Sequence, residues 1–256
     1  MATDPDVRIH IAQLDAFDPS IGIDWLTSDE AARLRAMTAP QRRRSFIAGH
    51  WLARHAAGEW LDLDPRQVAV RHHADGRPYL HVDASPGNNI IDIMRSSDRR
   101  PLSAPQPLRT PSLCLSISHS GDWLAVAVAN MPIGVDIEMS GRNRNFEALA
   151  RFAFSPEEAA RISALDATQR ATAFHQLWTL KEARGKRIGE GFLPEQSRKL
   201  TATAASAEQA EAISWAFQEG SLALAFDPGS RIDAMRIEFA NEPEPAGRTY
   251  WDFRQS

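Results

Sequence analysis

Two carboxylates lie two residues apart in the apolar stretch IGVDIE, residues 133–138. The stretch predicts a strand, and because strand side chains alternate between faces, Asp136 and Glu138 should point the same way. Two like charges at this spacing repel each other and need a compensating charge. Either solvent and nearby basic side chains supply that charge, or a bound cation does.

A third carboxylate follows in WTLKEARGK, residues 178–186. Glu182 and Lys186 are four residues apart on a predicted helix, so they share a face with Trp178. One interpretation is a surface salt bridge, which contributes only about 0.3–0.5 kcal/mol. The other is a site in which three acids hold a cation. Oxygen donors that leave positions for water and phosphate suit Mg²⁺, or Mn²⁺, better than Zn²⁺.

Several basic and hydroxyl side chains could bind a phosphorylated substrate beside such a metal. Arginine forks bind phosphate through paired hydrogen bonds, and two of the other groups end an apolar strand at a glycine turn. The alternatives are a histidine that hydrogen-bonds a loop and an arginine triplet that faces solvent. The candidates are Arg42, Arg43, Arg44, Arg77, Ser118 and His119.

The composition argues against several classes of protein. The chain has 256 residues and a net charge of −4, so no global basic field favours nucleic acid or an anionic membrane. The single cysteine, Cys114, excludes an intrachain disulfide. There is no secretory leader and no run of about 18 apolar residues, so we expect a cytoplasmic protein without a membrane span. Phosphate-loop, dinucleotide and hydrolase-elbow motifs are absent.

Hydrophobic periodicity and turn residues predict alternating helices and strands. A composition rich in Pro, Ser, Arg and Asn predicts an exposed insertion at residues 83–111, and the proline-rich end predicts a mobile tail. Helices are predicted from residue 29, at 41–61, from residue 155 and at 168–187. Strands or hairpins are predicted at 7–14, 68–71, 79–82, 113–129, 133–138, 212–227 and 235–239.

The two halves of the chain show the same order of elements: a helix, a strand and a hairpin. This order predicts an internal duplication, in which two similar subdomains pack about a pseudo-twofold axis with a site in the cleft between them. The predicted division is an N-terminal subdomain at 1–132, a C-terminal subdomain at 133–240 and a tail at 241–256.

Three motifs, in this order, carry a resemblance to a known family: SISHSGDWLAVAV, PIGVDIE and LWTLKEARGKRIGEGF. They resemble the large, Sfp-type class of 4′-phosphopantetheinyl transferases, whose signature is (I/V)G(I/V)D(I/V)E followed by WxxKE(A/S)xxK. Both parts match in full, and the resemblance covers about Arg42 to Phe226. It implies a monomer with an α+β fold of two similar subdomains. One departure is Gly185, which stands inside a helix where a larger residue is common.

The resemblance also implies a reaction. The family transfers 4′-phosphopantetheine from coenzyme A to a serine of an apo acyl or peptidyl carrier protein and releases adenosine 3′,5′-bisphosphate. Asp136, Glu138 and Glu182 would hold Mg²⁺, and Glu182 would be the general base, directly or through water. Lys186 would stabilise the pyrophosphate and the leaving phosphate.

The resemblance assigns the coenzyme A phosphates to polar and basic residues of the N-terminal half. Ser118 and His119 would bind them, with His119 near the 3′-phosphate, and Arg77 matches the basic residue of the family's Gly-Lys/Arg-Pro turn. Of the arginine triplet, Arg44 is the predicted phosphate ligand.

Two other functions would use the same residues. One is a degenerate relative that holds coenzyme A or a carrier protein without turnover, and the other is a metal-dependent phosphohydrolase acting on a nucleotide. An intact acidic trio with Lys186 argues against the first. Carrier proteins of this kind are acidic, so we expect apolar contacts with them rather than bulk attraction. The predicted carrier surface, with a place in the core as its alternative, is Phe146, Leu149, Phe152 and Phe154.

Overall fold

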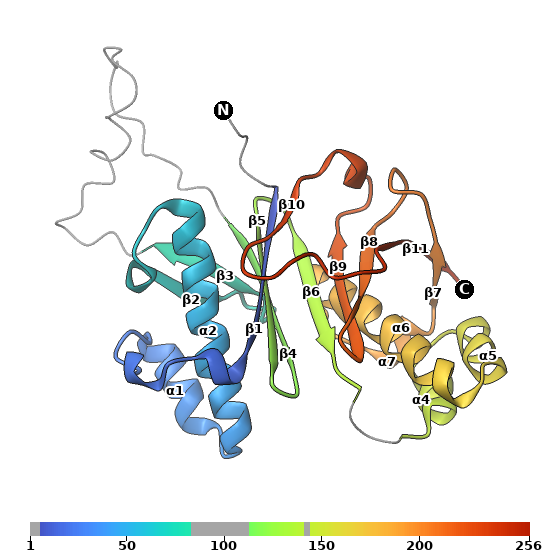
Figure 1. The fold of residues 1–256 in the computed structure, drawn as a ribbon, viewed down its shortest axis with the longest axis horizontal. Coiled ribbons are helices and arrows are strands. Elements are labelled where there is room, and N and C mark those ends of the chain that lie inside the picture. Colours follow the sequence, from blue (N-terminus) through green and yellow to red (C-terminus); the bar gives the residue numbers. More distant parts are fainter. Residues whose placement is uncertain (1–5, 83–112, 141–143) are drawn as a thin grey trace, which may run out of the picture.

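The structure, a computed structural model, describes residues 6–82, 113–140 and 144–256. Its strands form a six-stranded and a five-stranded sheet, which lie side by side in Figure 1 with helices on their outer sides. This α+β architecture was expected from the sequence. No helix in the described ranges is long and apolar enough to cross a membrane. The predicted insertion at 83–111 lies outside the described residues.

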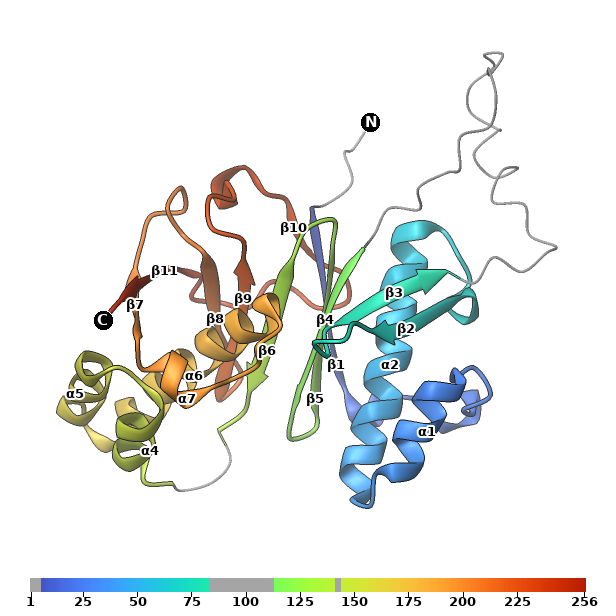
Figure 2. The same ribbon diagram turned by 180° about the vertical axis from the view of Figure 1, so that it is seen from behind.

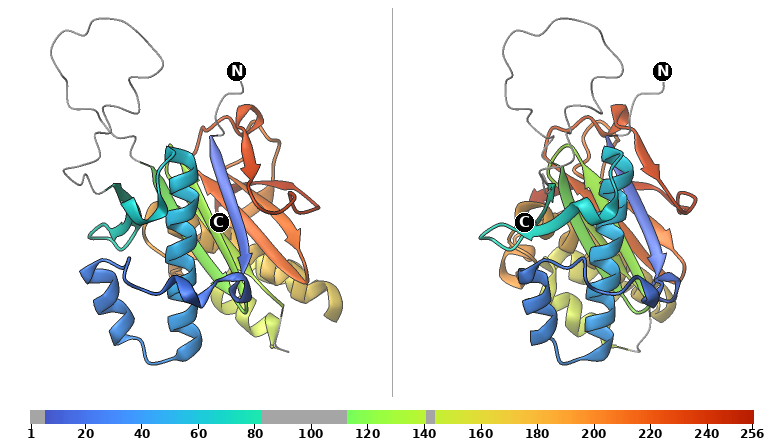
Figure 3. Two further views of the ribbon diagram at one scale, coloured as in Figure 1. Left: turned by 60° about the vertical axis from the view of Figure 1, so that its left-hand side comes forward. Right: turned by 90° about the vertical axis from the view of Figure 1, so that its left-hand side faces the viewer.

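The first sheet has the strand order β10-β1-β5-β4-β3-β2. The long helix α2 runs along one face of this sheet (Figure 3), and α1 lies beside α2. The strands are β1 (Val7–Gln13), β2 (Val68–His72), β3 (Pro78–Val82), β4 (Cys114–Ser120), β5 (Trp123–Ala129) and β10 (Ile237–Phe239), and the helices are α1 (Ser28–Ala36) and α2 (Pro40–Leu61).

The second sheet has the strand order β6-β9-β8-β11-β7. The view from behind in Figure 2 shows α6 across the face of this sheet that is turned away from the first one. The strands are β6 (Ile133–Glu138), β7 (Leu200–Ala204), β8 (Ala212–Phe217), β9 (Gly220–Phe226) and β11 (Thr249–Gln255), and the helices are α4 (Phe146–Ala153), α5 (Pro156–Ala164), α6 (Ala167–Ile188) and α7 (Pro194–Ser197).

The two halves repeat one topology. In each, a first strand (β1 or β6) precedes a helix of 22 residues (α2 or α6), and a hairpin (β4–β5 or β8–β9) follows. The second hairpin strand then pairs antiparallel with the first strand, β5 with β1 and β9 with β6. The predicted duplication is therefore confirmed, whereas the domain boundary at residues 132 and 133 stays a prediction.

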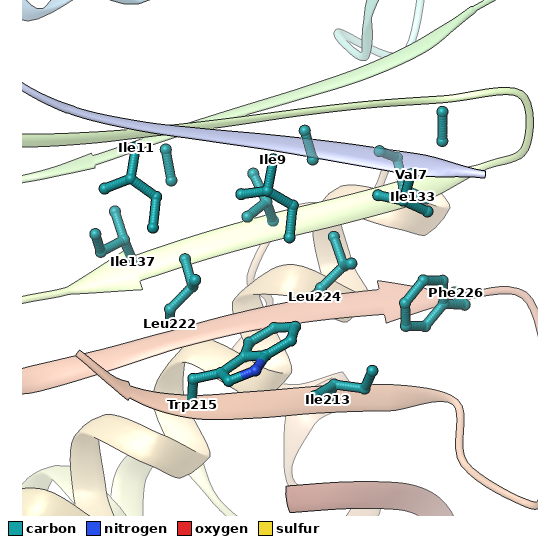
Figure 4. Close-up of a cluster of buried hydrophobic side chains, with 14 of the residues drawn as sticks. Val7, Ile9, Ile11, Ile133, Ile137, Ile213, Trp215, Leu222, Leu224 and Phe226 are labelled. Atoms are coloured by element: carbon teal, nitrogen blue, oxygen red, sulfur yellow. The ribbon is translucent and has the colours of Figure 1, made fainter. Parts of the chain in front are cut away.

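The sheets pack face to face on a shared core. Because strand side chains alternate, Val126 and Val128 of β5 face α2, whereas Ala125 and Ala127 face the second sheet. Fully burying one aliphatic side chain contributes about 1.5–3 kcal/mol, so this core joins the halves firmly. Figure 4 shows the side chains that meet there: Val7, Ile9, Ile11, Ile133, Ile137, Ile213, Trp215, Leu222, Leu224 and Phe226.

The prediction of a mobile tail at 241–256 was wrong. Thr249–Gln255 forms β11, which pairs antiparallel with both β7 and β8. Trp251 and Phe253 of this strand pack against the core under α6, and that burial outweighs the proline-rich approach that suggested mobility. The short helix α4 was also not predicted as a helix. Asn145 caps it by accepting a hydrogen bond from Ala148 N at 3.0 Å.

A buried ion cluster fastens α1 to α2. Glu30 accepts hydrogen bonds from His50 Nδ1 (2.7 Å) and from both terminal nitrogens of Arg54 (2.8 and 2.7 Å). Glu30 and Arg54 are each 1% exposed, so water could not compensate either charge if its partner were removed. Burial alone would raise the pKa of Glu30, but the bonds from His50 and Arg54 outweigh it and lower the pKa to about 2.

Replacing Glu30 with glutamine should destabilise the protein by about 3–5 kcal/mol at pH 7, because Arg54 keeps a buried, uncompensated charge. The folded-state pKa of Glu30 is depressed, so its contribution is present above the unfolded pKa of about 4.5 and is lost as pH falls toward 2. Urea unfolding at pH 7 and pH 3 should show the difference between the two proteins narrowing in acid. Glu59→Gln, at an exposed carboxylate of α2, is the control. Equal stabilities of wild type and Glu30→Gln at pH 7 would contradict the cluster's role.

Candidate active site

The site lies where β4 of the first sheet meets β6 of the second. Since β6 is an edge strand, alternate N–H groups of its backbone point outward and need acceptors. Three serines of β4, here called the serine ladder (Ser116, Ser118 and Ser120), provide those acceptors. The three bonds run from Val135 N to Ser116 Oγ (2.9 Å), from Ile137 N to Ser118 Oγ (3.4 Å) and from Met139 N to Ser120 Oγ (3.0 Å).

Serines of β4 also bind the carboxylates of β6, together with Lys186 of α6. Asp136 Oδ1 accepts hydrogen bonds from Ser118 Oγ and Lys186 Nζ, each at 2.7 Å, and Glu138 Oε2 accepts one from Ser120 Oγ at 2.8 Å. Asp136 is only 4% exposed, and its second oxygen, Oδ2, is buried without a hydrogen-bond partner. A buried carboxylate oxygen that lacks a partner is costly, so a further positive group at Oδ2 would stabilise it.

Helix α6 brings Lys186 and Glu182 to this strand. The helix begins after Asp166, whose side chain accepts the first N–H groups, and ends at Gly189 in the left-handed conformation. Lys186 Nζ also donates to Ser118 Oγ at 2.8 Å and to the carbonyl of Val135 at 3.2 Å. The ammonium group therefore joins α6 to both strands of the site.

Burial, together with the charges of neighbouring acids, raises the pKa of two of the acids. Glu182 has its pKa raised to about 7, first by burial and then by the charges of Asp136 and Glu138, while Lys186 opposes the shift. Burial and the charge of Asp136 also raise the pKa of Glu138, although its bond from Ser120 lowers it. Lys186 compensates Asp136, and the other two acids remain short of positive charge. The alternative of a Glu182–Lys186 surface pair is not among the ion pairs of the described residues.

The three acids, Asp136, Glu138 and Glu182, are candidate ligands of a metal ion. No group of three or more His, Cys, Asp or Glu in the described ranges is arranged to hold a metal as it stands. The chemistry nevertheless fits a hard cation: the donors are carboxylate oxygens, Asp136 Oδ2 lacks a partner, and burial beside Asp136 and Glu138 raises the pKa of Glu182. The residues fit the group, provided that the glutamate side chains reorient around it.

Three of the predicted phosphate ligands, Ser118, His119 and Arg77, lie near Lys186. His119 follows Ser118 and is exposed at the end of β4, and its pKa is lowered by desolvation and by the charges of Lys186 and Arg42. Arg77 pairs with Asp75 at 2.8 Å. Arg77 also lines a cavity of about 200 Å³, together with Lys186. This cavity lies between Lys186 and the turn that carries Arg77.

The arginine triplet separates into three different environments. Arg43 donates to the carbonyls of Leu34 and Met37 and so completes the end of α1. Arg44 forms an ion pair with Asp15. Arg42 is the member of the triplet whose charge acts on His119. Nothing in the run RRR distinguishes the three residues, because the distinction comes from tertiary contacts.

Sequence reasoning missed three parts of the site. It did not identify Ser116 and Ser120 as partners of β6, although serines at alternate strand positions share a face. It gave Gly134 no role, yet a Cβ there would lie 1.9 Å from the carbonyl oxygen of Ala183 in α6. It also gave no reason for Gly185, where a Cβ would lie 2.1 Å from the carbonyl oxygen of Gly191. Gly134 lets β6 approach the backbone of α6, and Gly185 lets the backbone of Gly191 approach it.

The fold and the site together define an α+β protein of two similar halves with an acid–lysine centre at their junction. The model of the 4′-phosphopantetheinyl transferase superfamily matches residues 132–228, which contain the acids and the lysine of this centre. Residues 132–228 of the chain therefore belong to the 4′-phosphopantetheinyl transferase superfamily.

Individual relatives agree with this placement. The chain is 31% identical to the 4′-phosphopantetheinyl transferase HetI of Nostoc sp. over 180 residues, which cover 70% of this chain and 65% of the relative. It is 28% identical to a 4′-phosphopantetheinyl transferase of Bacillus subtilis over 179 residues, 65% of this chain and 67% of the relative. Sfp of Bacillus subtilis is 37% identical over 82 residues, 32% of this chain and 36% of Sfp. The chain thus spans about two thirds or less of the length of these relatives.

Proposed function

We propose that this protein transfers 4′-phosphopantetheine from coenzyme A to a serine of an apo acyl or peptidyl carrier protein and releases adenosine 3′,5′-bisphosphate. The observation that carries the proposal is the cluster of Asp136, Ser118 and Lys186 next to Glu182, whose pKa of about 7 suits proton transfer at neutral pH. Membership of the superfamily supports the same reaction. We assign the protein to the large, Sfp-type class, as a monomer that acts in the cytoplasm.

The proposed metal is Mg²⁺, with Mn²⁺ as a substitute, held by Asp136, Glu138 and Glu182. When bound, such an ion acts as a Lewis acid on phosphate oxygens and neutralises the crowded carboxylates. The unpartnered Oδ2 of Asp136 and the raised pKa of Glu182 are the features that support these ligands.

The side chains of the site have definable roles in the proposed reaction. Glu182 accepts the proton of the carrier serine, whose oxygen forms a bond to the β-phosphorus of coenzyme A. The bond from that phosphorus to the bridging oxygen breaks, and adenosine 3′,5′-bisphosphate leaves. The ammonium group of Lys186 stabilises the negative charge that gathers on the leaving phosphate. Its bonds to Ser118 and Asp136 fix its position before the substrate arrives.

Coenzyme A would occupy the cavity beside Lys186. We propose that Arg77 and His119 bind its phosphates, with His119 at the 3′-phosphate. Arg42 is a better supported third cation than Arg44, because Arg42 acts on His119 whereas Arg44 pairs with Asp15. Ser118 is 5% exposed and already bonds Asp136 and Lys186, so its main contribution is to orient those two residues.

The decisive experiment is mass spectrometry of a panel of apo carrier proteins incubated with this protein, Mg²⁺ and coenzyme A. A gain of one phosphopantetheine on at least one carrier is the expected result, and the carriers modified show whether fatty-acid, polyketide or nonribosomal-peptide carriers are preferred. Hydrolysis of coenzyme A without any carrier would instead establish a phosphohydrolase. Binding of coenzyme A with no reaction on any carrier would establish a binding module.

Replacing His119 with alanine should weaken coenzyme A binding by about 1.5–3 kcal/mol, the contribution of a charge-assisted hydrogen bond. Calorimetry with coenzyme A and 3′-dephospho-coenzyme A measures the effect. Wild type should bind the dephosphorylated analogue more weakly, whereas His119→Ala should lose little more on the same change of ligand. If both proteins lost the same affinity on going from coenzyme A to the dephosphorylated analogue, His119 would not contact the 3′-phosphate. His55→Ala, at an exposed histidine of α2, is the control.

The predicted carrier surface divides between core and exterior. Phe154 is 1% exposed, and Phe146 and Leu149 pack against the core under α6, so these three serve the fold. Phe152 is 64% exposed on α4 and is the residue that remains available to a partner.

Phe152→Asp should therefore raise the KM for the carrier and leave the KM for coenzyme A unchanged, because only the carrier would lose an apolar contact. Steady-state kinetics with each substrate varied in turn measures both constants. Ile23→Asp, at an exposed apolar residue of the other half, is the matched control. An unchanged KM for the carrier in Phe152→Asp would place the carrier surface elsewhere.

A further inference from the structure

The serine ladder makes the same main-chain bond three times, but its rungs differ in their side-chain partners. Ser118 accepts from Ile137 N and donates to the preceding residue of β6, Asp136. Ser120, two residues further along β4, repeats the pattern: it accepts from Met139 N and donates to the preceding residue, Glu138.

Ser116 makes the same main-chain bond but has no side-chain partner on β6, and the sequence of β6 explains the difference. Ser116 accepts from Val135 N at 2.9 Å, and the residue that precedes Val135 is Gly134, which has no side chain to receive a bond. Each serine therefore pairs with one N–H and with whatever side chain precedes it. The two-residue period of β4 matches that of β6, so two hydroxyl groups reach two carboxylates.

We propose that Ser120 is a positioning residue that fixes the carboxylate of Glu138 for cation binding. The proposal rests on the proposed function, in which Glu138 is a metal ligand. A glutamate side chain has one more rotatable bond than an aspartate, so its carboxylate can take more positions. The Ser120 hydroxyl ties that carboxylate, through Oε2, to the backbone of the strand that carries it, and leaves the other oxygen for a cation.

Ser116 provides a matched control for this role. Removing its hydroxyl costs the same kind of ladder bond, to Val135 N, but within the described part of the chain Ser116 bonds no carboxylate. Ser116→Ala and Ser120→Ala should therefore lose similar stability, whereas only Ser120→Ala should loosen a ligand. Ser120→Thr keeps a hydroxyl at the same place and should behave as wild type.

The experiment is a titration of the full-length protein with Mn²⁺ alone, in which electron paramagnetic resonance reports the free ion and urea unfolding reports stability. We expect about a tenfold higher Kd for Mn²⁺ in Ser120→Ala, and changes below about twofold in Ser116→Ala and Ser120→Thr. In the background of Glu138→Gln, the further change Ser120→Ala should have no additional effect on the Kd. If Ser120→Ala does not fold, Ser120→Cys, a weaker donor of similar size, takes its place and should also raise the Kd.

Three outcomes would overturn the proposal, and they differ in what else they remove. Equal Kd values for wild type and Ser120→Ala, or equal weakening in Ser116→Ala and Ser120→Ala, would show that the ladder serves only the joint between the sheets. The proposed function would survive either result. If wild type did not bind Mn²⁺, there would be no cation site. That result would contradict both the metal part of the proposed function and the role of Ser120.

Discussion

Replacing Asp136 with asparagine should lower the rate of phosphopantetheine transfer by about a hundred- to a thousandfold while the protein stays folded, the loss typical when a charge-stabilising group is removed from an active site. Asparagine keeps the shape of the side chain and an oxygen that can accept the bonds from Ser118 and Lys186. It removes the negative charge that Lys186 compensates and that a cation would meet at Oδ2. The larger change Asp136→Ala should abolish transfer.

The measurement is carrier modification by mass spectrometry at limiting and at saturating Mg²⁺, with Asp122→Asn, at an exposed aspartate beside the β4–β5 turn, as the control. Turnover near that of wild type at limiting Mg²⁺ would show that Asp136 is not a metal ligand. Relief of repulsion among three acids would by itself stabilise the metal-free variant. Because Lys186 already compensates Asp136, however, Asp136→Ala should be less stable than wild type in urea.

The sequence periodicity of single elements predicted which site residues share a face of one strand or one helix. The alternation of IGVDIE placed Asp136 and Glu138 on one face of a strand, and helical spacing placed Glu182 and Lys186 on one face of α6. Both follow from backbone geometry alone. That Lys186 compensates Asp136, fifty positions away along the chain, depends on how α6 crosses β6, and no periodicity within either element contains that information.

The features that sequence reasoning missed all arise between elements. The serine ladder joins β4 of one sheet to the edge strand β6 of the other, so its pairing follows neither strand's hydrophobic pattern. Strand β11 was assigned to a mobile tail because a proline-rich segment precedes it, and its partners, β7 and β8, lie roughly 35 to 55 residues earlier in the chain. In the arginine triplet, the distinction between Arg42 and Arg44 came from Asp15 and His119, which belong to other elements.

Gly134 is the residue on which the distance between β6 and α6 depends, and Gly134→Ala should destabilise the protein by about 3 kcal/mol or more. The new Cβ would lie 1.9 Å from the carbonyl oxygen of Ala183 and 2.6 Å from the amide nitrogen of Arg187, so the helix backbone itself must move. Overpacking against side chains costs about 1–3 kcal/mol, and backbone relaxes less readily than a side chain. Thermal and urea unfolding measure the loss.

The same substitution should lower transfer by about a hundredfold even where the variant is folded, because Lys186 lies between Ala183 and Arg187 and moves with them. A displacement of about 1 Å in a positioned group costs a loss of this size. Gly49→Ala is the control: its Cβ would meet the Cγ2 methyl of Ile117, a side-chain atom, at 3.3 Å, and alanine favours the helix by up to about 1 kcal/mol. Wild-type stability and rate in Gly134→Ala would mean that α6 does not rest on β6 at this glycine, and the position of Lys186 would need another cause.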